Sequence, residues 1–352
     1  MKKLKFKLFL FFAIIAISAN TFAQKEVKKT FGSKEKIKIS TVSGDCIISK
    51  SENEQIQVKL TYSYPDDCFE FEVSDEGNYI RIKEEFDGKC SGDSRWEISL
   101  PENTNVEYNS ASGNLELSDI KKGLEANTAS GNMKLSGIAG EIELNTASGN
   151  ISIEKSSGEI KINSASGDIK LNAISGIMKI STASGSINAI QISNDYTFNV
   201  ASGSISINHS RGKGILNSAS GDISLNNSTG IFNLKAASGN ISAEMIELSG
   251  NSEMATASGA VLLKLAKTPA HNLSLSAASG DVTLDYGGNE INGYFEFMAR
   301  KEKGRIISPI KFDKEETVRI DGNDFDKKMF TRGSSTPVIL LKTSSGTVKL
   351  IK

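Results

Sequence analysis

Apolar and polar residues alternate along most of the chain in short runs. Within a run the apolar side chains occupy every second position, two and four residues after a glycine, as in Ile151 and Ile153 or Ile169 and Leu171. The positions between them hold Asn, Asp, Glu, Lys, Ser or Thr. A period of two is typical of a β-strand with one buried face. The pattern therefore predicts many short strands, each with an apolar inner side and a polar outer side.

The glycines that precede these runs recur at a constant interval. The tripeptide Ala-Ser-Gly places a "strong" glycine at every eighteenth position, at Gly113, Gly131, Gly149, Gly167, Gly185, Gly203, Gly221 and Gly239, and then more loosely at Gly259 and Gly280. "Weak" copies lie midway between strong glycines, at Gly140, Gly158, Gly176, Gly212 and Gly230. The unit is a doubled nonapeptide, and self-similarity of this kind indicates a repeat architecture.

Two features of the repeat predict where the chain bends. Asn recurs at the phase five residues after a glycine, at Asn127, Asn145, Asn163, Asn172, Asn199, Asn208, Asn217 and Asn226. Because Asn and Gly both tolerate left-handed backbone angles, we expect a corner at each. The residue two before the glycine is Ala in the strong copies and Ile or Ser in the weak ones, and we expect it to face inward.

Two strands and two corners in each doubled nonapeptide predict an all-β fold, a two-sided parallel β-solenoid with coils of about 18 residues. Each coil would form hydrogen bonds with its copies above and below. The chain has no Pro between Pro101 and Pro269, as expected of a ladder that needs every N–H donor. A sequential up-and-down antiparallel barrel or sandwich would also alternate, but it would not need Gly and Asn at the same phase in successive copies.

Charge divides the chain into regions. Residues 106–285, the regular repeats, hold 28 charged side chains in 180 positions, whereas residues 24–105 and 286–352 together hold 51 in 149. We interpret the two flanks as irregular β caps, since uncovered ends would offer unpaired strands to other molecules. Copies of the repeat at residues 42–45 and 344–350 predict that the first flank begins the solenoid and the second completes a final coil.

The first 23 residues have the pattern of a secretory signal peptide. Four lysines precede an apolar run from Leu8 to Ile17, and Thr21-Phe22-Ala23 provides a cleavage site after Ala23. A membrane anchor is the alternative, but the run is shorter than the roughly 20 residues that a bilayer crossing needs. Cleavage leaves 37 basic against 42 acidic residues, a net charge of −5, which argues against nucleic-acid binding.

Three cysteines in an exported chain leave one unpaired. Cys68 and Cys90 flank two alternating segments joined by the turn-like residues 75–78, so a bridge between them is one hypothesis. Cys46 stands where the alternation predicts an inward side chain, which favours a small buried hydrophobe over a nucleophile.

The segment from Trp96 to Val106, followed by Ser110-Ala111-Ser112-Gly113-Asn114 and reiterated S-G-(N/D)-(I/L) units, resembles the DUF4097 family of bacterial β-strand-repeat proteins named as adhesins. The resemblance covers nearly all of the chain after residue 23. It implies a solenoid and an exported or surface location, and it brings no functional residues with it.

Three kinds of binding chemistry can be compared with the repeat. Calcium-binding rolls need paired glycines and a regular Asp, but only three of the ten residues after a strong-phase glycine are carboxylates; we expect these polar residues to bond to neighbouring backbone. The Thr-x-Ser row that begins at Thr128 and Ser130 is similar to an ice-binding surface but is interrupted. Coil aromatics that could form sugar platforms are scarce, and the phase of Tyr196, Phe198 and Phe232 puts them inside.

Catalytic signals are weak as well. His209 and His271 lie far apart in the sequence without an informative Cys, Asp or Ser constellation, and Glu141, Glu143 and Glu159 are better explained as solvated charges on a ladder. We therefore nominate no catalytic, cofactor-binding or metal-ligating residue, and we expect no cofactor.

The sequence favours an exported, non-enzymatic solenoid that acts as a surface adhesion or scaffold module, in the periplasm, on the outer surface or secreted. The alternative is a β-helix protein that binds or degrades polysaccharide. The expected partner is a protein or glycan at a cell surface, with no membrane span after signal cleavage. A further hypothesis is self-association through the solenoid ends.

Overall fold

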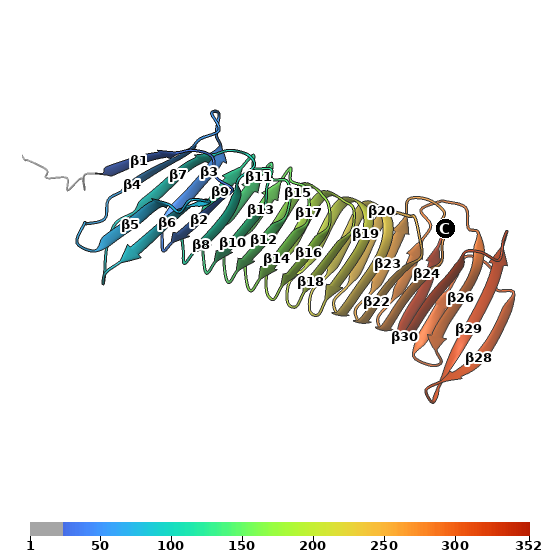
Figure 1. Ribbon diagram of the computed structural model, residues 1–352. Coiled ribbons are helices and arrows are strands. Elements are labelled where there is room, and N and C mark those ends of the chain that lie inside the picture. Colours follow the sequence, from blue (N-terminus) through green and yellow to red (C-terminus); the bar gives the residue numbers. More distant parts are fainter. Residues whose placement is uncertain (1–23) are drawn as a thin grey trace, which may run out of the picture.

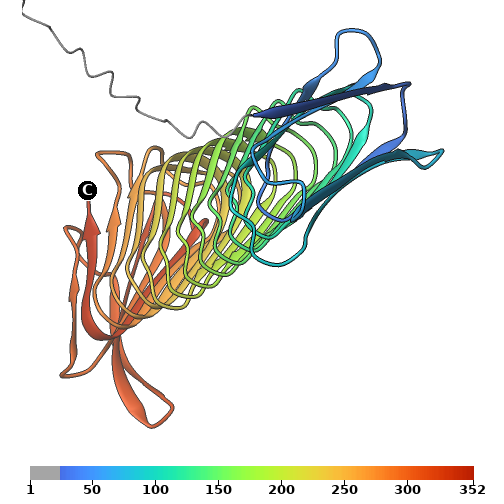
Figure 2. The same ribbon diagram turned by 90° about the vertical axis from the view of Figure 1, so that its left-hand side faces the viewer.

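The computed structural model describes residues 24–352, and every regular element in this range is a β-strand. Strands one doubled nonapeptide apart in sequence lie side by side in parallel, so that Leu124 pairs with Ile142 and Ile142 pairs with Ile160. The all-β class and a solenoid-like repeat are therefore confirmed, and the antiparallel alternative for the repeats is wrong. Figures 1 and 2 show the successive coils stacked into a rod.

The signal peptide predicted at residues 1–23 lies outside the described residues. Within residues 24–352 there is no helix with the length and apolarity to cross a membrane.

The strands form two walls that enclose a single core. The first wall consists of β2 (Lys36–Thr41), β8 (Asn105–Ser110), β10 (Leu124–Thr128), β12 (Ile142–Thr146), β14 (Ile160–Ser164), β16 (Met178–Thr182), β18 (Tyr196–Val200), the second halves of β19 (Ile205–Ser218) and β20 (Ile223–Ser238), β22 (Ser252–Ser258), β24 (Leu273–Ser279), the first half of β30 (Val338–Ile351) and β26 (Gly293–Arg300).

The second wall runs on the other side of the core. It consists of β3 (Asp45–Lys50), β9 (Leu115–Ser118), β11 (Met133–Ser136), β13 (Ile151–Glu154), β15 (Ile169–Ser175), β17 (Ile187–Ser193), the first halves of β19 and β20, β21 (Ile241–Leu248), β23 (Val261–Leu265), β25 (Val282–Asp285), the second half of β30 and β27 (Gly304–Ile307).

Both ends of the rod are extended by strands from the charged flanks. At the N-terminal end β6 (Tyr79–Phe86) pairs with β2 and β5 (Phe69–Asp75), while β7 (Ser94–Leu100) pairs with β3 and β4 (Ile56–Tyr62), which in turn pairs with β1 (Lys25–Phe31). At the C-terminal end β29 (Asn323–Arg332) pairs with β26 and with β28 (Lys314–Ile320).

The first and last coils of the chain are each enclosed by a flank. β2 lies between β6 and β8, and β30 lies between β24 and β26. The terminal copies of the repeat therefore join the ladder one coil inside its ends, and the flanking segments that follow β3 and β25 supply the outermost coils.

Aromatic side chains fill the core at both ends. Phe69 contacts Tyr64 and Phe86 in the N-terminal cap, and Phe330 packs on Phe295 and Phe297 in the C-terminal cap. Between the caps the core is a column made mainly of Ile, Leu, Val and Met from both walls, with Tyr196, Phe198 and Phe232 among them, nearly all of it inaccessible to solvent. Because a branched aliphatic side chain suits a pleated, half-buried surface, each coil repeats the same inner composition.

The strong glycines are required for a reason other than the left-handed backbone angles that the sequence suggested. Their φ angles lie outside the left-handed region from Gly113 to Gly239, but a Cβ on Gly149 would stand 1.9 Å from the carbonyl oxygen of Gly131. They are needed because successive coils approach each other closely at this corner.

The left-handed residues lie at the other corner. Weak glycines such as Gly158 (φ 119°) and Gly176 (φ 126°) adopt positive φ, as do residues six after a strong glycine, including Lys155 and Ala173. The expectation of left-handed Asn five after a glycine is therefore wrong, because none of the eight asparagines has a positive φ. After Asn172, Asn208 and Asn226 it is the next residue that adopts the left-handed conformation.

The inward direction predicted for Ala two before each strong glycine is also wrong. Ala129 and Ala147 are exposed, because the alternation that buries Ala126 and Thr128 places the next side chain outside. The weak copies follow the prediction, since Ile138 and Ser156 are buried.

The structure contains the disulfide that the sequence offered as a hypothesis, and the third cysteine is buried as expected. Cys68 and Cys90 form a disulfide with a Cα–Cα distance of 5.7 Å, at the open end of the β5–β6 pair. Cys46 is a buried free thiol, and burial raises its pKa far above the ordinary range, so it is not a nucleophile at neutral pH.

Candidate interaction surface

A shallow groove runs along the outside of the solenoid, at the corner that follows each strand of the first wall. Two hollows of about 730 and 860 Å³ form it, and they are continuous because Asn163, Ser164 and Ala183 line both. The lining reaches from Ser40 at one end to Ala237 at the other. The groove therefore runs along the first wall from β2 to β20.

Most coils contribute the same three kinds of residue to the groove, and the departures include Ser181, Val200, Lys235 and Ala236. The three kinds are an outward Asn near the end of the strand, an inward Thr or Ser beside it, and the exposed Ala of the Ala-Ser-Gly corner, as in Asn145, Thr146 and Ala147. The methyl groups of the alanines are too small to fill the corner, which leaves it hollow. The groove is thus a direct consequence of the repeat.

The asparagines form an amide ladder along one margin. Asn127 donates from Nδ2 to Oδ1 of Asn109 at 3.0 Å, and Asn145 and Asn163 each donate to the preceding Asn at 2.9 Å. The ladder is interrupted at Ser181 and begins again where Asn217 donates to Asn199 at 2.9 Å. An amide has two N–H donors and two acceptor lone pairs, so each ladder member keeps one of each for an external partner.

The groove is almost free of charge. Of the lining residues in the described chain, Lys235 alone is ionised. The surface therefore suits an uncharged partner that can exchange hydrogen bonds at each coil and lie on a row of methyl groups.

The Thr hydroxyls of the Thr-x-Ser row face inward, whereas the Ser side chains of the row, such as Ser130 and Ser148, are exposed. Thr128, Thr146 and Thr182 are buried, and the Oγ1 of each accepts a hydrogen bond from the backbone N–H of the strong glycine three residues later, at 2.8 to 3.0 Å. These hydroxyls close the corner from inside. Their small size and this bond are the structural reason for the row.

Most of the polar residues that follow a strong glycine bond to backbone, as the sequence led us to expect. The side-chain oxygen of Asn114 accepts from the N–H of Asn132, that of Asn132 accepts from Asn150, and Asp168 does the same for Ser186, each at 2.9 Å. The oxygens that a calcium roll would aim at an ion are used to join coils. Within residues 24–352, His, Cys, Asp and Glu side chains form no group of three placed to hold a metal ion.

The isolated titratable residues are not brought together. Lys161 pairs with Glu143 at 2.7 Å and Lys179 with Glu159 at 3.7 Å, which fits their interpretation as solvated ladder charges. His209 is an exposed residue at a left-handed corner. All five coil aromatics, Tyr108, Tyr196, Phe198, Phe232 and Tyr286, are inside the core.

The sequence pattern did not identify one buried polar residue, Glu84. Glu84 is 3% exposed, and its carboxylate accepts from Ser94 Oγ at 2.6 Å and Trp96 Nε1 at 2.7 Å, as well as from the backbone N–H groups of Val42 and Gly44. The available signal was its parity, since Glu84 follows Ile80 and Ile82 on the inner side of its strand. It joins the N-terminal cap to the first corner of the solenoid.

Comparison with known proteins identifies a family model. The model described as Toastrack DUF4097 matches residues 86–213 and 194–324, which together cover more than half of the chain. No curated protein matches the sequence.

Several solved structures are similar at low sequence identity. A "putative adhesin" from Parabacteroides distasonis is 14% identical, covers 72% of this chain and 97% of its own, and has a TM-score of 0.32. A "putative lipid binding protein" from the same organism is 15% identical, with coverage of 72% and 94% and a TM-score of 0.31. A "putative adhesin" from Bacteroides fragilis is 14% identical, with coverage of 93% and 97% and a TM-score of 0.26.

Proposed function

Since the chain belongs to the Toastrack DUF4097 family, we propose that it is an exported, non-enzymatic β-solenoid that acts as a surface adhesion or scaffold module. The observation that carries this proposal is the groove from Ser40 to Ala237, which repeats one set of polar and methyl groups at most of its coils. A surface of this kind offers many equivalent weak contacts instead of one reaction centre. Multivalent contact of a stiff rod supports attachment.

The buried interior supports a role without catalysis. Ile, Leu and aromatic side chains fill the space between the walls, and the ionisable groups on the outer walls are spread along ladders. Catalytic sites usually combine a concave pocket with convergent titratable groups. The groove is long, but among the described residues Lys235 is the one titratable group that lines it.

Attachment can be tested with variants that fill the groove. Purified residues 24–352 would be titrated onto intact cells and isolated envelopes of the native organism, with Ala165→Arg and Ala183→Arg placing a long side chain on two exposed positions of the groove. We expect saturable attachment that each variant weakens about tenfold or more. The matched control is Asn188→Arg, an exposed outward position in β17 on the second wall, which should bind as the parent does.

A polysaccharide-binding role is the second candidate, favoured by the neutral lining and the free amide donor and acceptor at each Asn rung. A glycan array and a depolymerisation screen with the same variants distinguish the two. Saturable binding to an uncharged glycan that the groove variants abolish would favour this candidate, and soluble products would show that the non-enzymatic proposal is wrong. Attachment to envelope protein without glycan binding would favour adhesion.

A further inference from the structure

The outermost strand at the C-terminal end has an uncovered edge. β28 pairs with β29 on one side, and within the described chain its other side has no neighbouring strand. Figure 1 shows β28 as the last strand of the rod at this end. An exposed edge presents a row of unpaired N–H and C=O groups that can pair with another strand.

The hairpin geometry fixes which residues present these groups. Asp321 (φ 48°) and Gly322 (φ 77°) form a two-residue turn with both φ angles positive, so Ile320 and Asn323 are a hydrogen-bonded pair. On β29 the carbonyl of Asp324 points away from β28, since it accepts from the N–H of Lys301 at 2.9 Å. The alternate residues of β28, namely Glu315, Thr317 and Arg319, therefore direct their backbone groups outward.

The charges on these three residues allow two copies of β28 to pair with each other. If two β28 strands pair in antiparallel orientation with Thr317 opposite Thr317 of the other copy, Glu315 of each stands directly opposite Arg319 of the other. Opposite charges at directly paired positions stabilise a sheet, and like charges destabilise it. All three side chains are exposed. Glu315 pairs with Lys328 of β29 at 2.9 Å and can also meet a second cation from its exposed side, whereas among the described residues Arg319 has no ion-pair partner.

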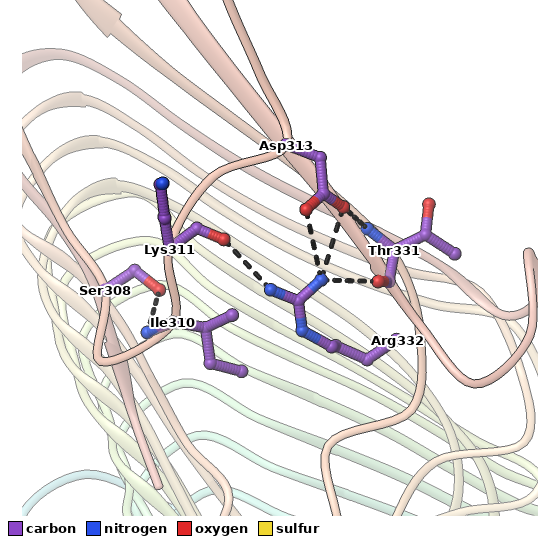
Figure 3. Close-up of polar contacts among 6 residues, drawn as sticks. All are labelled: Ser308, Ile310, Lys311, Asp313, Thr331 and Arg332. Atoms are coloured by element: carbon purple, nitrogen blue, oxygen red, sulfur yellow. Dashed lines mark hydrogen bonds and ion pairs between the residues drawn. The ribbon is translucent and has the colours of Figure 1, made fainter.

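The edge is held in place before any partner arrives. Figure 3 shows Arg332 of β29 bound to both carboxylate oxygens of Asp313, the residue before β28, at 3.2 and 3.3 Å, and to the carbonyl of Lys311 at 3.0 Å. Asp313 also accepts from the N–H of Thr331 at 2.8 Å. A preorganised strand loses less conformational entropy on pairing.

We propose that a second copy of this chain pairs with β28 about a two-fold axis at Thr317, so that two solenoids join at their C-terminal ends. The outward groups of Glu315, Thr317 and Arg319 then form one continuous antiparallel sheet, in the order β26, β29, β28 and the same strands of the other copy in reverse. Such an interface is isologous and closes at two copies. The dimer is bivalent, with the N-terminal caps at its far ends.

The interface is small, because it consists of one short strand from each copy. Interfaces of this size lie at the low end of the range, and we expect a weak dimer that forms as concentration rises. Sedimentation velocity from about 1 µM to 1 mM would report the equilibrium, and small-angle X-ray scattering would show a maximum dimension that approaches twice that of the monomer.

A charge exchange tests the register. Glu315→Arg places like charges opposite each other and is expected to abolish the dimer, while Glu315→Arg combined with Arg319→Glu restores opposite charges and is expected to restore it. The matched control, Glu290→Arg, makes the same charge change at an exposed site outside β28 and should leave the equilibrium unchanged. Loss in the single variant without recovery in the double variant would overturn the register.

A backbone variant tests the edge itself. Thr317→Pro removes an outward N–H but no bond to β29, so the variant should fold and remain monomeric, whereas Thr317→Val keeps the N–H and should dimerise. Thermal melting checks that both variants are folded. A chain that stays monomeric at every concentration, or a dimer that tolerates Thr317→Pro, would overturn the proposal.

Discussion

At the level of single residues, the coils depend on glycines that leave room for backbone. Gly167 illustrates this, because an added Cβ would lie 1.8 Å from the carbonyl oxygen of Gly149 and 2.6 Å from its carbonyl carbon. Neither atom can move without separating two rungs of the ladder. The amino-acid identity at this corner is therefore decided by the neighbouring coil and not by the φ angle of the glycine.

Gly149→Ala should destabilise the protein strongly, by about 3–5 kcal/mol, since its Cβ would overlap the carbonyl oxygen of Gly131. Denaturant unfolding measures the loss. Ala173→Gly is the control at the left-handed corner: Ala173 has φ 54°, and glycine there should stabilise by about 0.5 kcal/mol, because it relieves a left-handed alanine at some entropic cost. If both substitutions had similar effects, close approach would not be the reason for the strong glycine.

Buried tyrosines should make stability depend on alkaline pH. Burial raises the pKa of Tyr108 and Tyr196 to about 12, whereas an unfolded tyrosine titrates near its ordinary value of about 10. The folded state therefore keeps protons that the unfolded state releases, so the free energy of unfolding should fall as pH rises from 10 to 12, by up to about 1.4 kcal/mol per unit for each tyrosine.

Tyr196→Phe separates this effect from that of lysine titration. The variant loses the bond between the Tyr196 hydroxyl and Ser210, 2.8 Å long, and should be less stable by about 1 kcal/mol at pH 7. Between pH 10 and 12 its stability should fall less steeply than that of the parent in equilibrium unfolding. Parallel slopes would show that Tyr196 ionises as easily in the folded state as in the unfolded one.

At the level of elements, the N-terminal cap is attached by polar contacts that cross between strands. Lys29 of β1 donates to the carbonyl of Val73 on β5 at 2.8 Å, and Lys34 pairs with Asp75 at 2.7 Å, so the two outer edges are joined across the end of the core. Glu84 holds β6 to β7 and to the first corner. These contacts hold the outer strands of the cap to one another and to the first coil of the solenoid.

Glu84→Gln should cost about 2–4 kcal/mol, because an amide group would replace one oxygen and face two buried donors. Whichever way the amide turns, either Ser94 and Trp96 or the N–H groups of Val42 and Gly44 lose their acceptor. Glu116→Gln, on the exposed side of β9, is the matched control and should change stability little. Equal stabilities of the two variants in urea would contradict this role for Glu84.

The sequence predicted the repeating elements well, because period-two alternation and a constant repeat interval are local properties. It identified the inner residues of the strands, such as Ile151 and Ile153, and the returning final copy at residues 344–350. It could not predict the exposed row that includes Ala129, since small residues fit either side of a corner. Glu84 was missed because two of the groups that it binds, the N–H groups of Val42 and Gly44, are distant in sequence. The groove was not predicted either, because its shape depends on how successive coils stack.

At the level of the whole molecule, stability comes from repetition of coils between two cap segments. The enclosed positions of β2 and β30 mean that the first and last copies of the repeat lie inside the ladder, with cap strands beyond them. Each inner coil contacts only its neighbours, so the rod is a nearly one-dimensional array. The number of coils is then free to change, provided that the phase between coils is kept.

Removal of one full coil should therefore be tolerated, and removal of half a coil should not. Deleting residues 132–149 joins Gly131 to Asn150 and brings Leu124 opposite Ile160, while Lys161 finds Glu125 in place of Glu143. Every rung keeps an equivalent neighbour, and the rod shortens by about 4.8 Å. We expect a cooperative melt close to that of the parent.

Deleting residues 132–140 joins Gly131 to Glu141 and is the matched disruption. From that point a strong corner would stack on a weak one, so a glycine outside the left-handed region would meet a corner built from left-handed residues such as Gly158. The expected result is loss of cooperative melting, or a transition far below that of the full-coil deletion, followed by circular dichroism. If the two deletions melted alike, the nonapeptide and not the pair of nonapeptides would be the structural unit, and the two corners would be interchangeable.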